Sequence, residues 1–275
     1  MDSLFNNADY ESVIPTATTT LYPLIFTDIP YAKETFEFLE GKKKTEYLPD
    51  KILAVQYEAR HKLINKLLAK TGIKQVLELA SGFSARGIEL CKNEKIKYLE
   101  LDLPQVAQLK KELFNRDKTS NWEIIDGNAL NNYDFCEEYF DQNKEVAVIH
   151  QGLLRYLTFE ERAIIAQNVK KLLQKHGGVW ITCDFTPAKW IQKKDETMQN
   201  HNKKLSELTD RNNLPRFQDL QHVKDWLDKR GFCVEFHDFV EAESLLTSPK
   251  ILGISKEKVK HQLEHAVVTV IRLKI

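Results

Sequence analysis

Two residues that follow neighbouring apolar segments could together hold the sugar of a nucleoside. Gly82 comes two residues after the run at residues 75–80 (Q-V-L-E-L-A), and a glycine there lets the backbone turn sharply and lets a ligand approach the main chain. Asp102 lies near the end of the next run, residues 98–103, twenty residues after Gly82. A carboxylate at that position can accept hydrogen bonds from a ribose diol. The pattern predicts half of a nucleotide-binding site.

The turn lacks the glycines that a pyrophosphate group requires. Residues 80–85 read A-S-G-F-S-A, whereas the dinucleotide fingerprint is G-x-G-x-x-G. Ala80 and Ala85 replace two of the three glycines. The sequence therefore favours a nucleoside without phosphates, such as S-adenosylmethionine, over a dinucleotide. The structural alternative is an ordinary β-α-β unit with a glycine turn.

The elements that must position these residues alternate between strands and helices, which is typical of an α/β fold with a doubly wound, mostly parallel sheet. Asp50 and Gly72 predict the two ends of one helix, and a capping box at Thr158 predicts the start of another. The predicted strands are 75–80, 98–103, 122–126, 146–154, 178–185, 233–240 and 265–273. The predicted helices are 50–71, 85–91, 104–114, 158–176 and 217–230.

Five separated segments also carry a resemblance. They are residues 23–33 (P-L-I-F-T-D-I-P-Y-A-K), 57–64 (Y-E-A-R-H-K-L-I), 76–87 (V-L-E-L-A-S-G-F-S-A-R-G), 98–110 (Y-L-E-L-D-L-P-Q-V-A-Q-L-K) and 150–162 (H-Q-G-L-L-R-Y-L-T-F-E-E-R). In this order they resemble the leucine carboxyl methyltransferase family, which includes many bacterial O-methyltransferases of polyketide type. Five ordered matches are more specific than any one of them.

The resemblance implies the fold of class I S-adenosylmethionine-dependent methyltransferases. That fold is a seven-stranded, Rossmann-like sheet with helices on both faces and an antiparallel last strand beside the fifth. We expect a single methyltransferase domain, residues 1–275, with an N-terminal cap (1–47), a core (48–185 and 217–275) and an inserted lid after the fifth strand (186–216).

The resemblance also implies which residues contact the cofactor. In the family an arginine at the position of Arg60 reaches the methionyl carboxylate. Asn128 lies where class I enzymes often have an acid that meets adenine, although an Asx turn or a role for Asp126 is an alternative. Gln151 replaces a carboxylate that is common in the family, which removes a charge near the cationic donor. The expected cofactor-binding residues are Arg60, Glu78, Ala80, Ser81, Gly82, Asp102, Leu103, Asn128, Ala129 and Gln151.

Methyl transfer from a sulfonium is an in-line displacement in which positioning supplies most of the catalysis. A carboxylate acceptor is already ionised, whereas a hydroxyl acceptor benefits from a general base such as histidine. His150 lies toward the end of the predicted fourth strand and is the candidate base, with His201 and His237 as alternatives; a structural role is the other interpretation of His150. The candidates for acceptor binding are Arg155, Tyr156 and Trp190.

The composition limits the choice of partners and compartments. The chain has 40 basic and 40 acidic residues among 275, so no net field favours nucleic acid or an anionic membrane. Its four cysteines are scattered and form no C-x-x-C pair, which predicts buried reduced thiols and no metal site. We find no basic, apolar leader and no apolar stretch of membrane-spanning length. We therefore expect a cytoplasmic protein, whose oligomeric state the sequence leaves open.

Together these observations predict an S-adenosylmethionine-dependent O-methyltransferase that releases S-adenosylhomocysteine. The expected acceptor is a carboxylate or hydroxyl of a small molecule or peptide tail, and the sequence does not choose among these. One alternative is a non-catalytic cofactor-binding or regulatory protein on the same fold, since Asn128 and Gln151 both replace carboxylates. A less favoured alternative is an NAD-dependent oxidoreductase.

Overall fold

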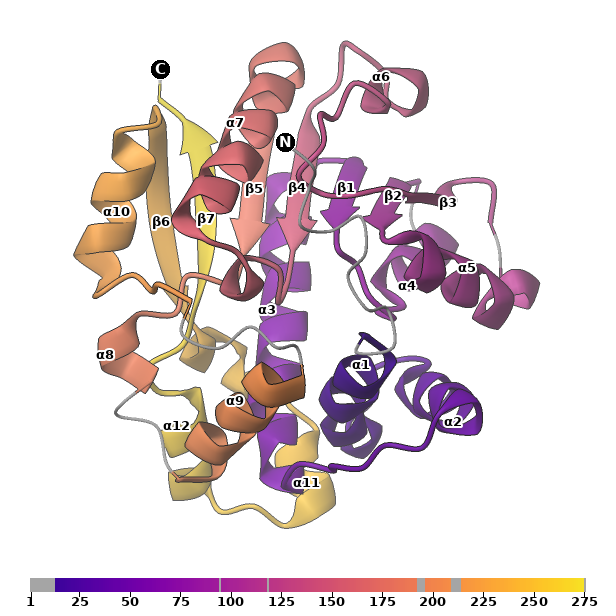
Figure 1. Ribbon diagram of the computed structural model, residues 1–275, viewed down its shortest axis with the longest axis vertical. Helices are drawn as coiled ribbons and strands as arrows, with labels where there is room; N and C mark the ends of the chain where they lie inside the picture. The colour runs from indigo at the N-terminus through magenta and orange to yellow at the C-terminus, as the bar shows by residue number, and fades with distance from the viewer. Residues whose placement is uncertain (1–12, 94, 118, 192–195, 209–213, 275) are drawn as a thin grey trace.

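A single seven-stranded sheet runs through the computed structural model, which describes residues 13–93, 95–117, 119–191, 196–208 and 214–274 (Figure 1). The strand order is β3-β2-β1-β4-β5-β7-β6. The first five strands in this order, β3, β2, β1, β4 and β5, pair in parallel. β7 pairs antiparallel with both β5 and β6. The strands are β1 (Gln75–Leu79), β2 (Lys97–Asp102), β3 (Trp122–Asp126), β4 (Val146–His150), β5 (Gly178–Thr182), β6 (Phe232–Asp238) and β7 (Val267–Leu273). The predicted doubly wound α/β fold with an antiparallel last strand is confirmed.

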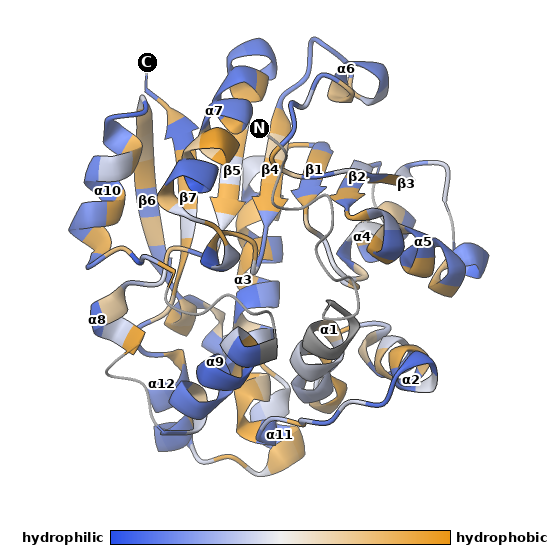
Figure 2. Ribbon diagram, in the orientation of Figure 1, coloured by the Kyte–Doolittle hydropathy of each residue, from blue (hydrophilic) through white to orange (hydrophobic). Residues whose placement is uncertain are grey.

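The central strands are apolar because helices cover both of their faces. Every residue of β1 and β4 is buried, as expected for parallel strands in the middle of a layered fold, and Figure 2 shows these strands as mostly hydrophobic. One face packs against α3, α4 and α12, and the other packs against α6, α7 and α10. The bounds of these helices are α3 (Ala54–Thr71), α4 (Arg86–Asn93), α6 (Cys136–Tyr139), α7 (Phe159–His176), α10 (Leu220–Asp228) and α12 (Lys256–Leu263).

The helix ends follow the signals read in the sequence. The Asp50 side chain accepts a hydrogen bond from the Ile52 N–H at the 3₁₀ turn that leads into α3, and Gly72 ends α3 in a left-handed conformation. Thr158 and Glu161 form the predicted capping box at the start of α7. These caps satisfy backbone groups that a helix end otherwise leaves without partners.

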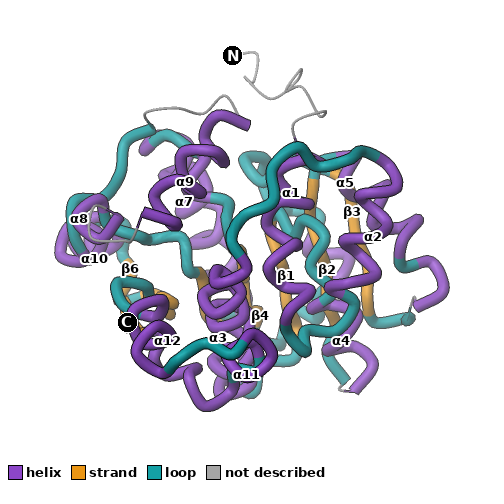
Figure 3. The backbone as a smooth tube through the Cα atoms, turned by 90° about the horizontal axis from the view of Figure 1, so that it is seen from below, coloured by secondary structure: helices purple, strands orange, loops and turns teal. Residues whose placement is uncertain are grey.

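Two helical layers lie beyond the carboxyl ends of the parallel strands (Figures 1 and 3). Leu21, Leu24 and Leu39 of the N-terminal layer (residues 13–42) form a small core with Met198 of α9 and the turn residue Phe83. Residues 1–12, 192–195 and 209–213 of the expected cap and lid lie outside the described residues. The elements around this edge are α1 (Val13–Leu21), a 3₁₀ helix (Tyr22–Phe26), α2 (Ala32–Lys42), α5 (Pro104–Leu113), α8 (Ala188–Ile191), α9 (Glu196–Leu208) and α11 (Ser248–Leu252).

Two predicted strands end three or more residues earlier than expected. β4 ends at His150 instead of residue 154, and β5 ends at Thr182 instead of residue 185. Gly152 adopts a positive φ of 88°, which ends the extended conformation, and Leu154–Tyr156 forms a 3₁₀ turn. The apolar residues 153 and 154 thus belong to a loop at the edge of the sheet, where apolar composition alone does not mark the end of a strand.

Gly87 in α4 is required by close packing on β2 and β3. A Cβ atom at this position would lie 2.5 Å from Glu100 Oε1 and 2.6 Å from Trp122 Cδ1. Both side chains are buried, and Trp122 Nε1 donates a hydrogen bond to Glu100 Oε1 at 2.8 Å. An added methyl group therefore has to displace two side chains that are held by each other.

We expect Gly87→Ala to lower the free energy of unfolding by about 1–3 kcal/mol, because overpacking a core forces neighbouring groups out of place. Gly41→Ala is the matched control, since Gly41 lies in α2 and a methyl group added there would meet no atom within 4 Å. The control should change stability by at most about 1 kcal/mol, in the stabilising direction. Urea unfolding of both variants measures this, and equal stabilities would contradict the packing argument.

Candidate functional site

A cavity of about 370 Å³ opens at the carboxyl edge of the sheet. Its floor is formed by the turn after β1, the end of β2 and the loops after β3 and β4, and its roof by the N-terminal layer and α9. In a doubly wound sheet this edge is where ligands bind. The roof residues are Ala17, Thr20, Leu21, Leu24, Ile29, Pro30, Tyr31, Ala32, Thr35 and Leu205.

The residues predicted to bind a cofactor are brought together around this cavity, although they come from five separate segments. The structure thus shows that they share a site, and their binding role stays a prediction. Arg155 and Tyr156, predicted to bind the acceptor, line the same cavity. The predicted cofactor residues that line it are Arg60, Glu78, Ala80, Ser81, Gly82, Asp102, Leu103, Asn128, Ala129 and Gln151.

Asp102 joins β2 to the turn that follows β1. Its Oδ2 accepts a hydrogen bond from the Gly82 N–H at 2.6 Å, and its Oδ1 accepts one from the Leu103 N–H at 2.8 Å. Burial raises the pKa of Asp102 to about 6, although these two hydrogen bonds act in the opposite direction. Each oxygen keeps a further lone pair, so the carboxylate can still accept from a ligand hydroxyl.

The turn has an unusual backbone conformation with open space beside it. Gly82 has a φ of 55°, and a Cβ there would meet no atom within 4 Å. Ala80 also adopts a positive φ, 48°, which is unfavourable for a residue with a Cβ atom and is commonly found at functional sites. The turn thus keeps a strained backbone conformation that leaves open space above Gly82.

A buried ion pair supports the turn from below. Glu100 on β2 pairs with Lys110 on α5, and both side chains are fully buried. Ser81 donates a hydrogen bond to Glu100 Oε2 at 2.8 Å and accepts one from Lys110 Nζ at 3.1 Å. Ser81 therefore ties the backbone beside Gly82 to a charged pair that has no access to water.

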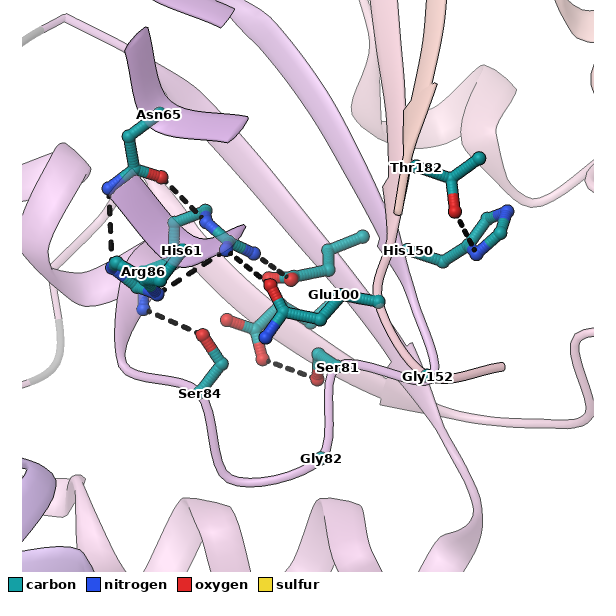
Figure 4. A network of polar contacts seen from close by, with 12 residues as sticks. His61, Asn65, Ser81, Gly82, Ser84, Arg86, Glu100, His150, Gly152 and Thr182 are labelled. Atoms are coloured by element: carbon teal, nitrogen blue, oxygen red, sulfur yellow. Dashed lines mark hydrogen bonds and ion pairs between the residues drawn. The ribbon is translucent and has the colours of Figure 1, made fainter. Parts of the chain in front are cut away.

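A second buried network centres on Arg86, which sequence reasoning did not identify as a site residue (Figure 4). Its guanidinium pairs with Glu78 and donates to Asn65 Oδ1 at 2.7 Å and to Gln151 Oε1 at 2.9 Å. Glu78 also accepts from the Tyr98 hydroxyl at 2.8 Å. In the sequence, Arg86 is marked only by its place in the Arg-Gly pair that ends the resembling segment 76–87.

The hydrogen bond from Arg86 fixes the orientation of Gln151. The amide oxygen of Gln151 accepts from Arg86 Nη2, so its NH₂ group is the part left to face other partners. Asn128 is oriented in a similar way, because its Oδ1 accepts from the Leu130 N–H at 2.9 Å. The predicted Asx turn therefore forms at Asn128 while the residue lines the cavity; Asp126, the alternative, is exposed and does not line it.

Asp184, which follows β5, holds the loop after β4 in place. Its carboxylate accepts hydrogen bonds from the N–H groups of Gly152, Leu153 and Leu154 at 2.5, 2.7 and 2.9 Å. Burial alone would raise the pKa of Asp184, but hydrogen bonds from His150 and from these N–H groups hold it well below its usual range. The sequence marks Asp184 only as a strand-end acid, so its contacts with a distant loop were not predicted.

His150, the candidate base, lies outside the cavity. The side chain is fully buried, with Nδ1 2.8 Å from Asp184 Oδ2 and 3.0 Å from Thr182 Oγ1, and the ring packs on Trp180. It does not line the cavity with its neighbour Gln151. This geometry argues for the structural role of His150, because successive side chains of a strand point to opposite faces.

Two further candidates lie away from the cavity. Trp190 in α8 is half-buried against His265, at 5.9 Å between ring centroids, and does not line the cavity. Trp190 was expected to bind the acceptor, but its ring contacts His265 outside the cavity. His237 on β6 pairs with Glu235 and Glu241 and is also absent from the lining.

His201 in α9, the other alternative base, is also absent from the cavity lining, although it contacts the lining residue Tyr57. Its Nε2 lies 2.5 Å from the Tyr57 hydroxyl, and its ring stacks on Tyr47. Burial lowers the pKa of His201 to about 3, and the charges of Arg155 and Arg60 act in the same direction. The imidazole is therefore neutral at physiological pH, and it fastens α9 to Tyr57 on α3.

Solved structures with the same architecture identify the class of fold. The chain superposes on a DUF574 family protein from Streptomyces avermitilis with a TM-score of 0.58 and 14% identity, covering 93% of this chain and 97% of that one. It superposes on human N-acetylserotonin methyltransferase, solved with SAM, with a TM-score of 0.54 and 12% identity, covering 90% and 59%. At these identities the likeness shows the fold, which is that of the Rossmann-like methyltransferases.

Sequence comparison then identifies the family. A profile of the leucine carboxyl methyltransferase family matches residues 29–170, just over half of the chain. The chain therefore belongs to the leucine carboxyl methyltransferase family, and the resemblance read from the five segments is confirmed.

Relatives are found among mycobacterial proteins. The chain is 24% identical over 189 residues to a candidate S-adenosyl-L-methionine-dependent methyltransferase of Mycobacterium marinum, covering 60% of this chain and 56% of that protein. It is 22% identical over 219 residues to a protein of the same description from Mycolicibacterium paratuberculosis, covering 74% and 66%. The chain thus spans between half and two thirds of the length of these relatives.

The structure also bears on what the sequence predicts for the cysteines, for metal binding and for membrane-spanning segments. Cys91 and Cys136 are buried as predicted, but Cys233 at the sheet edge is exposed and Cys183 is partly exposed. Within the described ranges, no group of three His, Cys, Asp or Glu side chains is arranged to hold a metal ion. None of the helices in those ranges is long and apolar enough to cross a membrane.

We expect Asp184→Asn to lower the free energy of unfolding by about 2–4 kcal/mol, because one amide oxygen cannot replace a buried carboxylate that accepts several N–H groups. Asp134 is exposed, so Asp134→Asn is the matched control, and we expect it to change the free energy of unfolding by at most about 0.5 kcal/mol. Chemical denaturation measures both. If Asp184→Asn were as stable as the control, Asp184 would not be what holds the loop.

Proposed function

We propose that this protein is an S-adenosylmethionine-dependent O-methyltransferase that acts on a carboxylate or hydroxyl of a small molecule or peptide tail. The observation that carries the proposal is the pairing of Gly82 and Asp102 at the edge of one cavity. The family match and the names of the relatives support the same activity. The test is whether the purified chain binds this cofactor and transfers its methyl group.

The groups around the cavity fit a nucleoside that carries an amino-acid tail. Asp102 offers carboxylate oxygens to a ribose diol, and Asn128 and Ala129 line the side where a base would lie. Arg60 lines the same cavity, and its Nε, which is buried, has no hydrogen-bond partner among the described residues. A guanidinium in that state suits the carboxylate of a methionyl group.

The same residues do not suit a dinucleotide. A pyrophosphate binds where consecutive backbone N–H groups and small residues leave room for it. Here the Gly82 N–H is already donated to Asp102, and Phe83 is packed into the core of the N-terminal layer. An acid and a single turn glycine therefore favour the nucleoside cofactor over NAD.

The cofactor supplies an electrophilic methyl group on a sulfonium when it is bound. The chain's own residues orient the two reactants and exclude water. The N-terminal layer and α9 roof the cavity, and Tyr57, Arg155 and Tyr156 line the side on which an acceptor could enter. Since His150 faces away from this space and His201 is hydrogen-bonded to Tyr57, a carboxylate acceptor, which requires no base, fits this site well.

Titration of the chain with S-adenosylmethionine by calorimetry tests the cofactor, with NADH as the comparison ligand. We expect saturable binding of the first and none of the second. Transfer of a labelled methyl group from the cofactor to components of a cell extract tests the activity, with Asp102→Ala as the negative control. Absence of cofactor binding at about millimolar concentration would refute the proposal, whereas binding without any transfer would favour a non-catalytic binding protein.

The raised pKa of Asp102 predicts how cofactor affinity depends on pH. Ribose hydroxyls donate hydrogen bonds to the ionised carboxylate, so protonation below a pKa of about 6 removes the binding-competent form. The dissociation constant should therefore rise about tenfold between about pH 7 and about pH 5. Calorimetry at the two pH values measures the change.

Asp102→Asn provides the control, because an amide in the same place does not titrate. This variant should bind more weakly than wild type at about pH 7 and should lose the dependence on pH. A dissociation constant for wild type that stays constant over this range would show that Asp102 does not contact the ligand in its ionised form.

A further inference from the structure

A second, smaller cavity of about 100 Å³ adjoins the first one and shares Tyr57, Arg60, Gly152 and Arg155 with it. We call it the side cavity. It lies between α3, the loop after β4, the strand-end residues Cys183 and Asp184, and the segment that carries Arg216. Its volume suits a small group of a few heavy atoms, since one water molecule occupies about 30 Å³ in the liquid.

Three arginines, Arg60, Arg155 and Arg216, line this small space. Among the described residues none of the three forms an ion pair within 4 Å. Arg155 donates to Asn202 Oδ1 at 3.0 Å, and Arg60 lies over the Tyr57 ring at 4.3 Å. Arginines gathered in this way repel one another, and they are usually found together where an anion binds.

The one acid in the lining does not neutralise these charges by direct contact. Asp184 directs its oxygens to His150 and to three backbone N–H groups. Burial lowers the pKa of Arg216 to about 10, and the charges of Arg155 and Arg162 add to this effect. An anion in the side cavity would relieve both the repulsion and the loss of hydration.

We propose that the side cavity is a subsite for an acidic group of the methyl acceptor, a carboxylate or phosphate, with Arg155 and Arg216 as its ligands. This inference rests on the proposed methyltransferase function and adds the class of acceptor, an organic acid. It also assigns Arg216, which no sequence motif marked, as a specificity-determining residue.

The acidic group in the side cavity is an anchor and not the oxygen that is methylated. When a carboxylate oxygen is methylated, its lone pair forms the C–O bond, the S–CH₃ bond breaks, and both the anion and the sulfonium become neutral. Arginines that hold the reacting anion stabilise the ground state more than the transition state, which slows the reaction. A cluster of arginines is therefore better suited to a group that keeps its charge throughout.

Binding of inorganic phosphate to the chain saturated with S-adenosylhomocysteine tests the subsite by calorimetry. We expect saturable binding by wild type, weakened about tenfold or more in Arg216→Gln, since the variant loses a charge-assisted hydrogen bond. Arg216→Lys should retain part of the affinity, and the exposed Arg116→Gln should match wild type. Arg216 does not line the larger cavity, so affinity for S-adenosylhomocysteine should be unchanged and reports correct folding.

The outcomes separate this inference from the proposed function. If S-adenosylhomocysteine does not bind to wild type, the proposed function itself fails. If it binds but phosphate does not, or if phosphate binds equally well to Arg216→Gln, the subsite is wrong. Incubation with labelled cofactor and acetate tests whether the group in the side cavity is itself methylated. Methyl ester formation that depends on Arg216 would place the reacting carboxylate in the side cavity, and would contradict the claim that this group is only an anchor.

Discussion

The buried guanidinium of Arg86 connects three separate segments of this molecule. It pairs with Glu78 in β1, donates to Asn65 in α3 and reaches Gln151 in the loop after β4. Burying a charge is costly unless it is paired and fully hydrogen-bonded, and removing one partner leaves the other uncompensated. These contacts therefore hold β1, α3 and the loop after β4 in fixed positions relative to one another, and the turn at Gly82 follows directly from β1.

The same interaction accounts for a departure from the family pattern. A glutamine at position 151 lacks the charge that the family commonly has there, yet its carbonyl oxygen accepts from Arg86 as a carboxylate oxygen would. Arg86 already has Glu78 as a counter-ion, so a second acid beside it is not required for electrostatic balance. The substitution keeps the hydrogen-bond network intact and changes the group presented to the cavity from an acceptor to a donor.

Sequence reasoning predicted the features that depend on local pattern. The alternation of apolar segments and the caps at Asp50 and Thr158 depend on neighbours along the chain, and the Gly82–Asp102 spacing lies within one β-α-β unit. It failed where a role depends on which face of an element a side chain occupies: His150 points away from the cavity although Gln151 lines it. It also missed Asp184 and Arg216, because neither residue lies in a segment with a recognisable motif and Asp184 contacts a loop about 30 residues earlier in the chain.

The position of β7 has a consequence for how the sheet is completed. β7 lies between β5 and β6 and pairs antiparallel with both, although it follows both of them in the sequence. Until residues 267–273 are in place, β5 has one unpaired edge and β6 pairs with no other strand. Exposed strand edges are templates for association with other chains. The last strand therefore pairs with one edge of β5 and one edge of β6, and a chain that ended before residue 267 would leave both of these edges free to associate with other chains.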